Sequence, residues 1–128
     1  MLRNIVSDEA PAPVGPYSQA IKAGPMLFIS GQVALGPTGQ EALPEGVAAQ
    51  ATKVMDNISA ILAEAGAGWG HVCKASIFLT TMADFATVNA IYEQYLALPY
   101  PARETVAVVG LPKGAFVEIS VTAYMGQV

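Results

Sequence analysis

The sequence predicts an α+β fold in which two helices cover one face of a single mixed β-sheet of about six strands. Two segments, from Val47 to Ala65 and from Asp84 to Pro99, carry apolar residues at three- and four-residue spacings with polar residues opposite. The remaining segments read as strands, which gives the order β-β-β-α-β-α-β-β. Because each helix has only one apolar stripe, both are expected to pack on the same side of one sheet. With 128 residues, the chain is expected to form one domain, residues 1–128.

The first part of the chain is expected to form three short strands around a rigid loop. Between residues 10 and 16, alternating proline and small residues exclude both a helix and ladder pairing. Gly24-Pro25 is typical of a hairpin turn. Gly31 interrupts the strand that follows, as glycine does at a bulge or where backbones approach closely. The expected strands are residues 4–6, 20–23 and 26–30.

Both predicted helices have recognisable ends. Gly66 and Gly68 stop the first helix, since glycine favours the position just beyond a helix C-terminus. Asp84 is suited to the N-cap of the second helix, and Pro99 ends it. The stripe of the first helix consists of Val47, Ala51, Val54, Met55, Ile58, Ile61, Leu62 and Ala65, and that of the second consists of Phe85, Val88, Tyr92, Tyr95 and Leu96.

The segment between the helices, residues 71–80, alternates between two sets of side chains as a strand with one buried face does. One set contains Cys73, so this cysteine is expected to be a buried small hydrophobe rather than a nucleophile. It is the only cysteine of the chain, which excludes an internal disulfide and suits a reducing cytoplasm.

The last quarter of the chain is expected to form two adjacent strands, within residues 100–109 and 116–125. The second strand alternates strictly, so Val117 and Ile119 face the core and Glu118 leaves it on the other side. Arg103 lies in the first strand, just after Pro101. An arginine and a glutamate are thus expected on neighbouring strands of a chain that is only 12% charged.

Two interpretations of Arg103 and Glu118 stay open at this point. The first is structural: they form a cross-strand ion pair, or both are solvated residues at the sheet edge. The second is a site for a small anion, because a guanidinium forms two parallel hydrogen bonds with a carboxylate. In that case the nearby Glu118 is free to handle a proton or a water molecule.

The overall composition excludes several classes of function. A net charge of −4 leaves no basic face for phosphates, so a nucleic-acid partner is not expected. The chain shows neither a signal peptide nor an apolar run long enough for a membrane span, which predicts a soluble, cytoplasmic protein. Its apolar content of 53% is high for one small core, and Ser120, Thr122 and Tyr124 leave the second sheet face uncharged. Both features favour a subunit interface.

Motifs for metal or nucleophilic catalysis are not found. One histidine, His71, and one cysteine are too few for a metal site. No G-x-S-x-G segment occurs, so a serine triad is not supported. The candidates that remain are Tyr17, Ser30-Gly31, Arg103 and Glu118, each near the end or edge of an expected strand.

Five short segments, in order along nearly the whole chain, carry the most specific signal. They are Gly15–Ala20, Ser30–Gln32, Phe85–Tyr92, Pro101–Arg103, and Leu111–Lys113 followed by Val117–Ile119. In these segments the chain resembles the RidA (YjgF) family of reactive-intermediate deaminases. Five segments in register are far more specific than any one of them.

The resemblance implies a homotrimer of a chorismate-mutase-like α+β fold with clefts between subunits. It implies the hydrolysis of enamines and imines such as 2-aminoacrylate, 2-iminopropanoate and 2-iminobutanoate to 2-oxo acids and ammonia, with no cofactor and no metal. Arg103 would hold the substrate carboxylate, Glu118 would position the attacking water, and Tyr17 would cover the ligand. The remaining substrate-binding residues implied by the resemblance are Ser30, Gly31, Phe85, Asn89 and Thr105.

The chain departs from the family pattern at two places. Many members have Cys or Ala where this chain has Thr105, so a thiol is absent there although a backbone role survives. The segment from Glu93 to Tyr100 is also shorter than in several members, which affects the rim of the cleft. An alternative function is a non-catalytic trimeric module that binds 2-oxo acids as a sensor. Both functions use Arg103, and only the enzyme needs Glu118.

Overall fold

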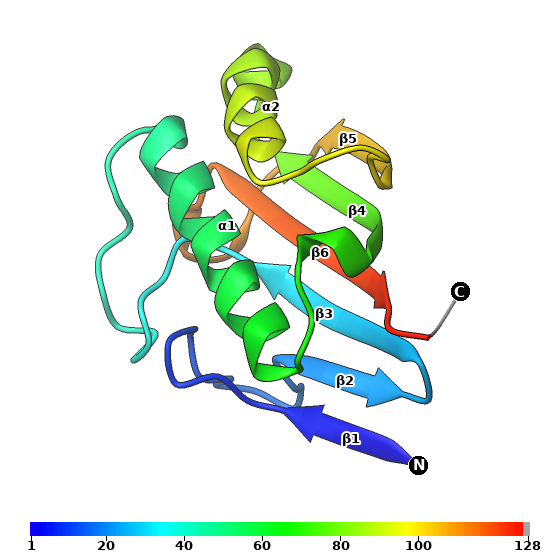
Figure 1. Cartoon of the computed structure of the whole chain (residues 1–128). Helices are drawn as coiled ribbons and strands as arrows, with labels where there is room; N and C mark the ends of the chain where they lie inside the picture. The colour runs from blue at the N-terminus through cyan, green and yellow to red at the C-terminus, as the bar shows by residue number, and fades with distance from the viewer. Residues whose placement is uncertain (127–128) are drawn as a thin grey trace.

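The computed structural model describes residues 1–126 and has the predicted α+β architecture (Figure 1). Six strands form one mixed sheet, and two α-helices lie among them in the predicted order. The elements are β1 (Leu2–Ile5), β2 (Ala20–Ala23), β3 (Met26–Gln32), α1 (Val47–Glu64), β4 (Val72–Leu79), α2 (Phe85–Gln94), β5 (Ala102–Ala107) and β6 (Val117–Tyr124). Every expected helix and strand is present, although β1 begins two residues before the expected 4–6 and α2 ends at Gln94, before Pro99.

The strands are ordered β1-β2-β3-β6-β4-β5 in the sheet. The prediction that the last two strands are adjacent is wrong, because β4 lies between β5 and β6. The reason is the connection through α2: a helical crossover lets β5 run parallel to β4 and pair on its outer edge. The chain then returns, and β6 pairs antiparallel with both β3 and β4.

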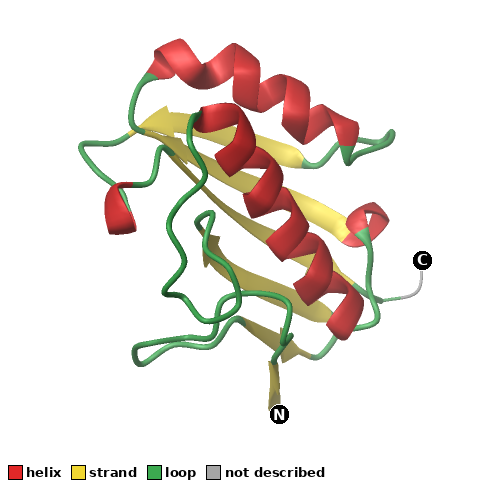
Figure 2. Ribbon diagram, turned by 90° about the vertical axis from the view of Figure 1, so that its left-hand side faces the viewer, coloured by secondary structure: helices red, strands yellow, loops and turns green. Residues whose placement is uncertain are grey.

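Both helices cover the same face of the sheet, as predicted (Figure 2). Their apolar stripes pack against alternate residues of β3, β4 and β6, so one core fills the space between the two layers. None of the helices in residues 1–126 is both long and apolar enough to span a membrane. The largest fully buried apolar side chains include Leu27, Met55, Ile58, Ile61, Leu62, Ile77, Leu79 and Ile119.

The start of α2 differs in detail from the predicted N-cap. Asp84 occupies the residue before the helix, but its side chain forms no capping hydrogen bond. A short 3-10 helix, Met82–Asp84, precedes α2, and the Thr81 hydroxyl accepts a hydrogen bond from the Ala83 amide at 3.2 Å. The capping side chain thus serves the first turn of this combined helical segment rather than α2 itself.

Cys73 is exposed, contrary to the prediction that it is a buried hydrophobe. The pairing of β4 with β6 shifts between Val72, opposite Ala123, and Lys74, opposite Thr122. Cys73 is the extra residue of this bulge, so its side chain leaves the alternation that the sequence pattern assumed. Its thiol lies 3.4 Å from the Thr122 carbonyl oxygen.

The proline-rich loop is held against the sheet by one buried side chain, Gln19. Its Oε1 accepts a hydrogen bond from the Ser7 amide at 2.7 Å. Its Nε2 lies 3.1 Å from the Ser7 carbonyl oxygen, 3.3 Å from that of Ala10 and 2.8 Å from that of Pro11. Prolines cannot donate backbone hydrogen bonds, so the loop cannot pair with a strand. The Gln19 side-chain amide satisfies the backbone groups of the loop instead.

We expect Gln19→Ala to lower the free energy of unfolding by about 2–3 kcal/mol, because it leaves buried backbone groups of the loop without partners. Urea unfolding at a fixed protein concentration measures this change. Gln40→Ala, a substitution of an exposed loop glutamine, is the matched control and should change stability little. A loss below about 0.5 kcal/mol for Gln19→Ala would contradict this role.

Candidate functional site

Arg103 lies on the helix-covered side of β5, in a cradle formed by α2. Its register partner on β4 is Ala75, which is fully buried against the helices. Phe85, Asn89 and Tyr92 share one face of α2, since they are separated by four and three residues. The guanidinium Nη1 donates a hydrogen bond to Asn89 Oδ1 at 2.5 Å. The guanidinium carbon lies 5.6 Å from the Phe85 ring centroid and 5.3 Å from that of Tyr92.

This cradle fixes the guanidinium without neutralising it. Aromatic rings attract a cation through their electron-rich faces, and the Asn89 oxygen fixes one nitrogen. Among residues 1–126 the one ion pair within 4 Å joins Lys74 and Glu104, so the charge of Arg103 has no carboxylate partner there. The Arg103 side chain is exposed and can meet a planar carboxylate from the open side.

Thr105 lies two residues further along β5 and points to the same side of the sheet. It is opposite Ile77, and its buried hydroxyl has no hydrogen-bond partner among the described residues. Together with Phe85, Asn89 and Arg103 it lines a narrow depression between α2 and β5. The predicted residues Arg103, Phe85, Asn89 and Thr105 are therefore brought together by the fold.

Glu118 lies on the opposite, open face of the sheet. Its neighbours along β6, Val117 and Ile119, are fully buried towards the helices, so alternation directs Glu118 away from them. A Cβ atom at Gly31 would lie 2.5 Å from Glu118 Oε2, so the carboxylate rests directly against the glycine backbone. The β-bulge between Ile29 and Gln32 carries Gly31 to this position. Burial raises the pKa of the Glu118 carboxyl above its ordinary value of 4.5.

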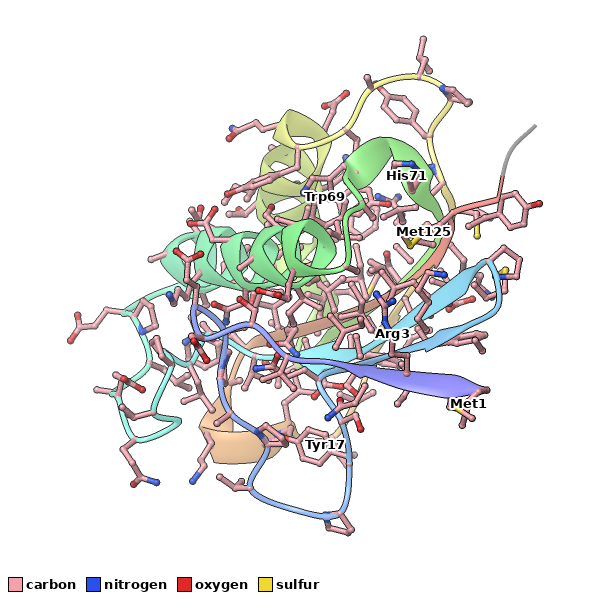
Figure 3. All side chains as sticks on the ribbon, turned by 60° about the horizontal axis from the view of Figure 1, so that its bottom comes forward. Met1, Arg3, Tyr17, Trp69, His71 and Met125 are labelled. Carbon is pink, nitrogen blue, oxygen red and sulfur yellow. The ribbon has the colours of Figure 1, made fainter. Side chains whose placement is uncertain are left out.

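Ser30 holds the end of the proline-rich loop that carries Tyr17. The Ser30 hydroxyl donates to the Ser18 carbonyl oxygen at 2.6 Å, and the Ser30 amide donates to that of Gln19 at 2.9 Å. These two bonds fix the backbone next to Tyr17, whose side chain is 52% exposed. In Figure 3, Tyr17 lies below the sheet, whereas Trp69 beside α1 lies above it.

The structure therefore divides the predicted site residues into two groups. Arg103 and its neighbours face the helix layer, and Glu118 with Gly31 faces the open side. The prediction of a shared neighbourhood for Arg103 and Glu118 is wrong within one chain, and so is the alternative of a cross-strand ion pair between them. Two causes act together: β4 separates the two strands, and the side chains leave the sheet in opposite directions.

Two residues that matter for this geometry were not identified from the sequence. Tyr92 was assigned to the apolar stripe, and periodicity alone cannot show that its ring also supports a cation. Gln19 belongs to a recognised segment, but its four hydrogen bonds join residues that are distant in the sequence. The signal for Tyr92 was its position, seven residues after Phe85 and three after Asn89 on one helix face.

The chemistry that these groups support is anion binding at one face and proton handling at the other. A rigidly held guanidinium recognises a carboxylate, and a partly desolvated carboxylate with a raised pKa suits a general base. Within residues 1–126 no group of three or more His, Cys, Asp or Glu side chains is placed to hold a metal ion.

Comparison with known proteins places this geometry in context. Residues 7–125 match the family model described as Endoribonuclease L-PSP. The chain is 42% identical over 127 residues to the 2-iminobutanoate/2-iminopropanoate deaminase of Bos taurus, covering 98% of this chain and 93% of the relative. It is similar to the crystal structure of RidA from a Psychrobacter species, with 46% identity, a TM-score of 0.90, and 95% and 98% of the two chains covered. It is also similar to Escherichia coli TdcF with bound serine, with 37% identity, a TM-score of 0.90, and 97% and 99% covered.

We expect Glu118→Gln to leave the melting temperature at pH 7 unchanged or raised, because it removes a partly desolvated charge. The folded-state pKa is raised, so the native wild type loses stability as pH rises from 4.5 through that pKa, and the variant should lack this loss. Thermal melts from pH 4 to 8 test both points, with Glu64→Gln at an exposed glutamate as control. A drop of several degrees would contradict this expectation and show that the charged carboxylate stabilises the native protein.

Proposed function

The chain belongs to the RidA (YjgF) family, and on that premise we propose that it is a hydrolytic deaminase of reactive enamines and imines. Residues 1–128 act as one RidA-like domain in the cytoplasm. The substrates are 2-aminoacrylate, 2-iminopropanoate and 2-iminobutanoate, and the products are the 2-oxo acids and ammonia. The observation that carries this proposal is the Arg103 guanidinium, held by Asn89 and two aromatic rings with its charge unpaired by any carboxylate of residues 1–126.

Substrate binding depends on Arg103. Every proposed substrate carries a carboxylate on the carbon that bears the reacting nitrogen, and the enamine 2-aminoacrylate becomes an imine when one proton moves from its nitrogen to its terminal carbon. A planar guanidinium binds this carboxylate with two parallel hydrogen bonds. Because Asn89 already holds Nη1, the guanidinium has little freedom to rotate. The reacting carbon is thereby placed at a fixed distance from the guanidinium. Holding a substrate in one position in this way accelerates its reaction with water.

The chemical step depends on a positioned water molecule and Glu118. The water oxygen forms a bond to the imine carbon while the Glu118 carboxylate takes one of its protons. Glu118 returns that proton to the nitrogen, and a second proton reaches the nitrogen to replace the O–H proton that is lost as the C=O bond forms. The C–N bond then breaks and the nitrogen leaves as ammonia. One imine and one water give one 2-oxo acid and one ammonia. A raised carboxyl pKa places Glu118 closer to neutral pH, where it can both accept and return a proton.

The complete site forms between subunits of a homotrimer. One subunit contributes Arg103 with Phe85, Asn89 and Thr105, and the next contributes Glu118 with Tyr17, Ser30 and Gly31. This arrangement is supported by their placement on opposite faces of the sheet in one chain. It is also supported by large apolar side chains that the open face leaves exposed. These are Phe28, Val106 and Tyr124.

A second candidate is a non-catalytic module that senses small carboxylates, because the similar TdcF structure is described with bound serine. Such a module would use Arg103 and would not need Glu118. Ribonuclease activity, which the description of the family model names, is not favoured by a chain of net charge −4.

A coupled assay separates the enzyme from the sensor. Threonine dehydratase releases the imine, and 2-oxobutanoate formation is followed with and without this protein. We expect wild type to accelerate the reaction, and Arg103→Lys to reduce kcat/KM roughly 10²-fold because lysine lacks the two-pronged geometry. Glu118→Gln should reduce turnover by roughly 10²-fold as well while leaving 2-oxobutanoate binding within a few fold.

The same assay tests the pH dependence. In wild type, kcat/KM should fall as pH drops through the Glu118 pKa, which lies above 4.5, and Glu118→Gln should lack this decline.

The controls for this assay come from the same chain. Arg3→Lys changes the one other arginine, which is exposed on β1, and Glu64→Gln changes an exposed glutamate of α1. Both should hydrolyse the imine at the wild-type rate. Full activity of a folded Glu118→Gln variant would exclude the role assigned to Glu118, and wild type without any turnover but with oxo-acid binding would favour the sensor.

Mixing two inactive variants tests whether the site lies between subunits. Each complete site needs Arg103 from one subunit and Glu118 from its neighbour. Randomly assembled trimers of Arg103→Lys and Glu118→Gln chains, co-expressed in equal amounts, should therefore recover about one quarter of the wild-type activity. Activity per mole of chain is measured on the trimeric fraction from sedimentation. No recovery would mean that both residues act from one chain, and a monomer in sedimentation would exclude the proposed assembly.

A further inference from the structure

A buried side-chain amide in the first turn of α1, that of Gln50, joins three segments that are distant in the sequence. Gln50 is 3% exposed, and its Oε1 accepts a hydrogen bond from the Phe116 amide at 2.9 Å. Its Nε2 donates to the Pro44 carbonyl oxygen at 3.1 Å. Side chains in a helix tilt towards its N-terminus, so Gln50 reaches past the start of α1 to both partners.

The bond to Phe116 lies where β6 is paired along one edge. The register of β3 with β6 ends at Ile119, whereas the register of β4 with β6 continues to Val117. Before β6 the chain passes through a short irregular turn, in which Lys113 has a positive φ of 61°. The first residues of β6 thus lie between an irregular segment and a one-sided ladder, and such strand ends open more readily than strand centres.

Glu118 is the second residue of this strand and lies two residues after Phe116. The burial of Val117 fixes the face of the sheet on which Glu118 lies. Backbone hydrogen bonds fix where the strand begins, and both polar groups of Phe116 are engaged. Its amide donates to Gln50, and its carbonyl oxygen accepts from the Thr80 amide at 3.3 Å. These two bonds attach the start of β6 to α1 and to the end of β4.

We infer that Gln50 is a positioning residue for the deaminase reaction: it holds the start of β6, and thereby the Glu118 carboxylate, in the place where this carboxylate meets the attacking water. The inference rests on the proposed function and adds to the site a residue that is itself buried in the fold. A general base must lie within hydrogen-bond reach of the proton that it removes, so a shift of about 1 Å at the strand end slows the reaction. Binding of the substrate carboxylate uses Arg103 on β5 and does not depend on this strand end.

The first measurement uses wild type alone, and it decides even where a Gln50 variant does not fold. Hydrogen exchange should show that the Phe116 amide is protected to the degree that is typical of β6, although Phe116 precedes the first residue of that strand. A Phe116 amide that exchanges as fast as in an unstructured peptide would mean that the bond to Gln50 is not formed. That result would overturn the inference.

The second measurement is the effect of Gln50→Met, which keeps a side chain of similar length and removes both hydrogen bonds. In the coupled assay, kcat should fall roughly tenfold or more, while 2-oxobutanoate binding through Arg103 stays within a few fold. Gln50→Glu should keep most of kcat, because a carboxyl oxygen still accepts from the Phe116 amide. Ser59→Ala is the control: it removes the acceptor of the Trp69 indole further along α1, and it should lower the melting temperature without changing kcat.

A double-mutant cycle separates positioning from general damage to the fold. In the Glu118→Gln background, Gln50→Met should cause no further loss of kcat, because the group that Gln50 positions is already absent. An equal fractional loss in both backgrounds, or an equal loss in Gln50→Glu and Gln50→Met, would overturn the inference while the deaminase function stands.

If wild type hydrolyses no imine, the deaminase function fails and hydrogen exchange decides on the role of Gln50. Faster exchange of residues 116–119 in Gln50→Met, but not in Ser59→Ala, would support the hold of Gln50 on the strand end that carries Glu118. Unchanged exchange of these residues in Gln50→Met would overturn it.

Discussion

The burial of alternate β6 residues beneath α1 is the constraint on which the arrangement of functional groups depends. Val117 and Ile119 are fully buried in the core, and a strand cannot turn two neighbouring side chains to the same side. Glu118 is therefore held on the open face, where it is half-buried and forms no ion pair with residues 1–126. The same alternation, carried across the sheet to β5, places Arg103 under α2. The packing that stabilises the fold thus places the Arg103 guanidinium and the Glu118 carboxylate on opposite faces of the sheet, and the proposed site therefore combines groups from two chains.

Most of the fold could be predicted from the sequence because its elements have strong local signals. The helices were located by one apolar stripe each, and β6 by strict alternation. Strand order was predicted incorrectly, since the pairing of β6 with β4 joins residues far apart in the chain and leaves no local pattern. The exposure of Cys73 was missed for a related reason: a bulge inserts one residue into a strand without changing its composition.

The candidate site could be predicted as a set of residues but not as a geometry. The resemblance in short segments named Arg103, Asn89 and Phe85, and the structure brings these together in one cradle. It could not reveal that Tyr92 supports the guanidinium, because a half-polar aromatic residue on a helix stripe reads as core. Nor could sequence reasoning show a pocket next to Arg103, whose walls combine the end of α2 with a segment of irregular backbone.

The contact between Gly31 and Glu118 has a consequence for how this chain can vary during evolution. A methyl group at position 31 would collide with the Glu118 carboxylate in its present rotamer, so a larger residue there requires the acid to move or to be replaced. A lineage that abandons the acid for a shorter side chain releases the constraint on the glycine. A lineage that keeps the acid in its present rotamer keeps the glycine, although Gly31 itself bears no chemical group. A side chain at position 31 would therefore mark homologues in which the acid has been replaced or its carboxylate has moved away from this backbone.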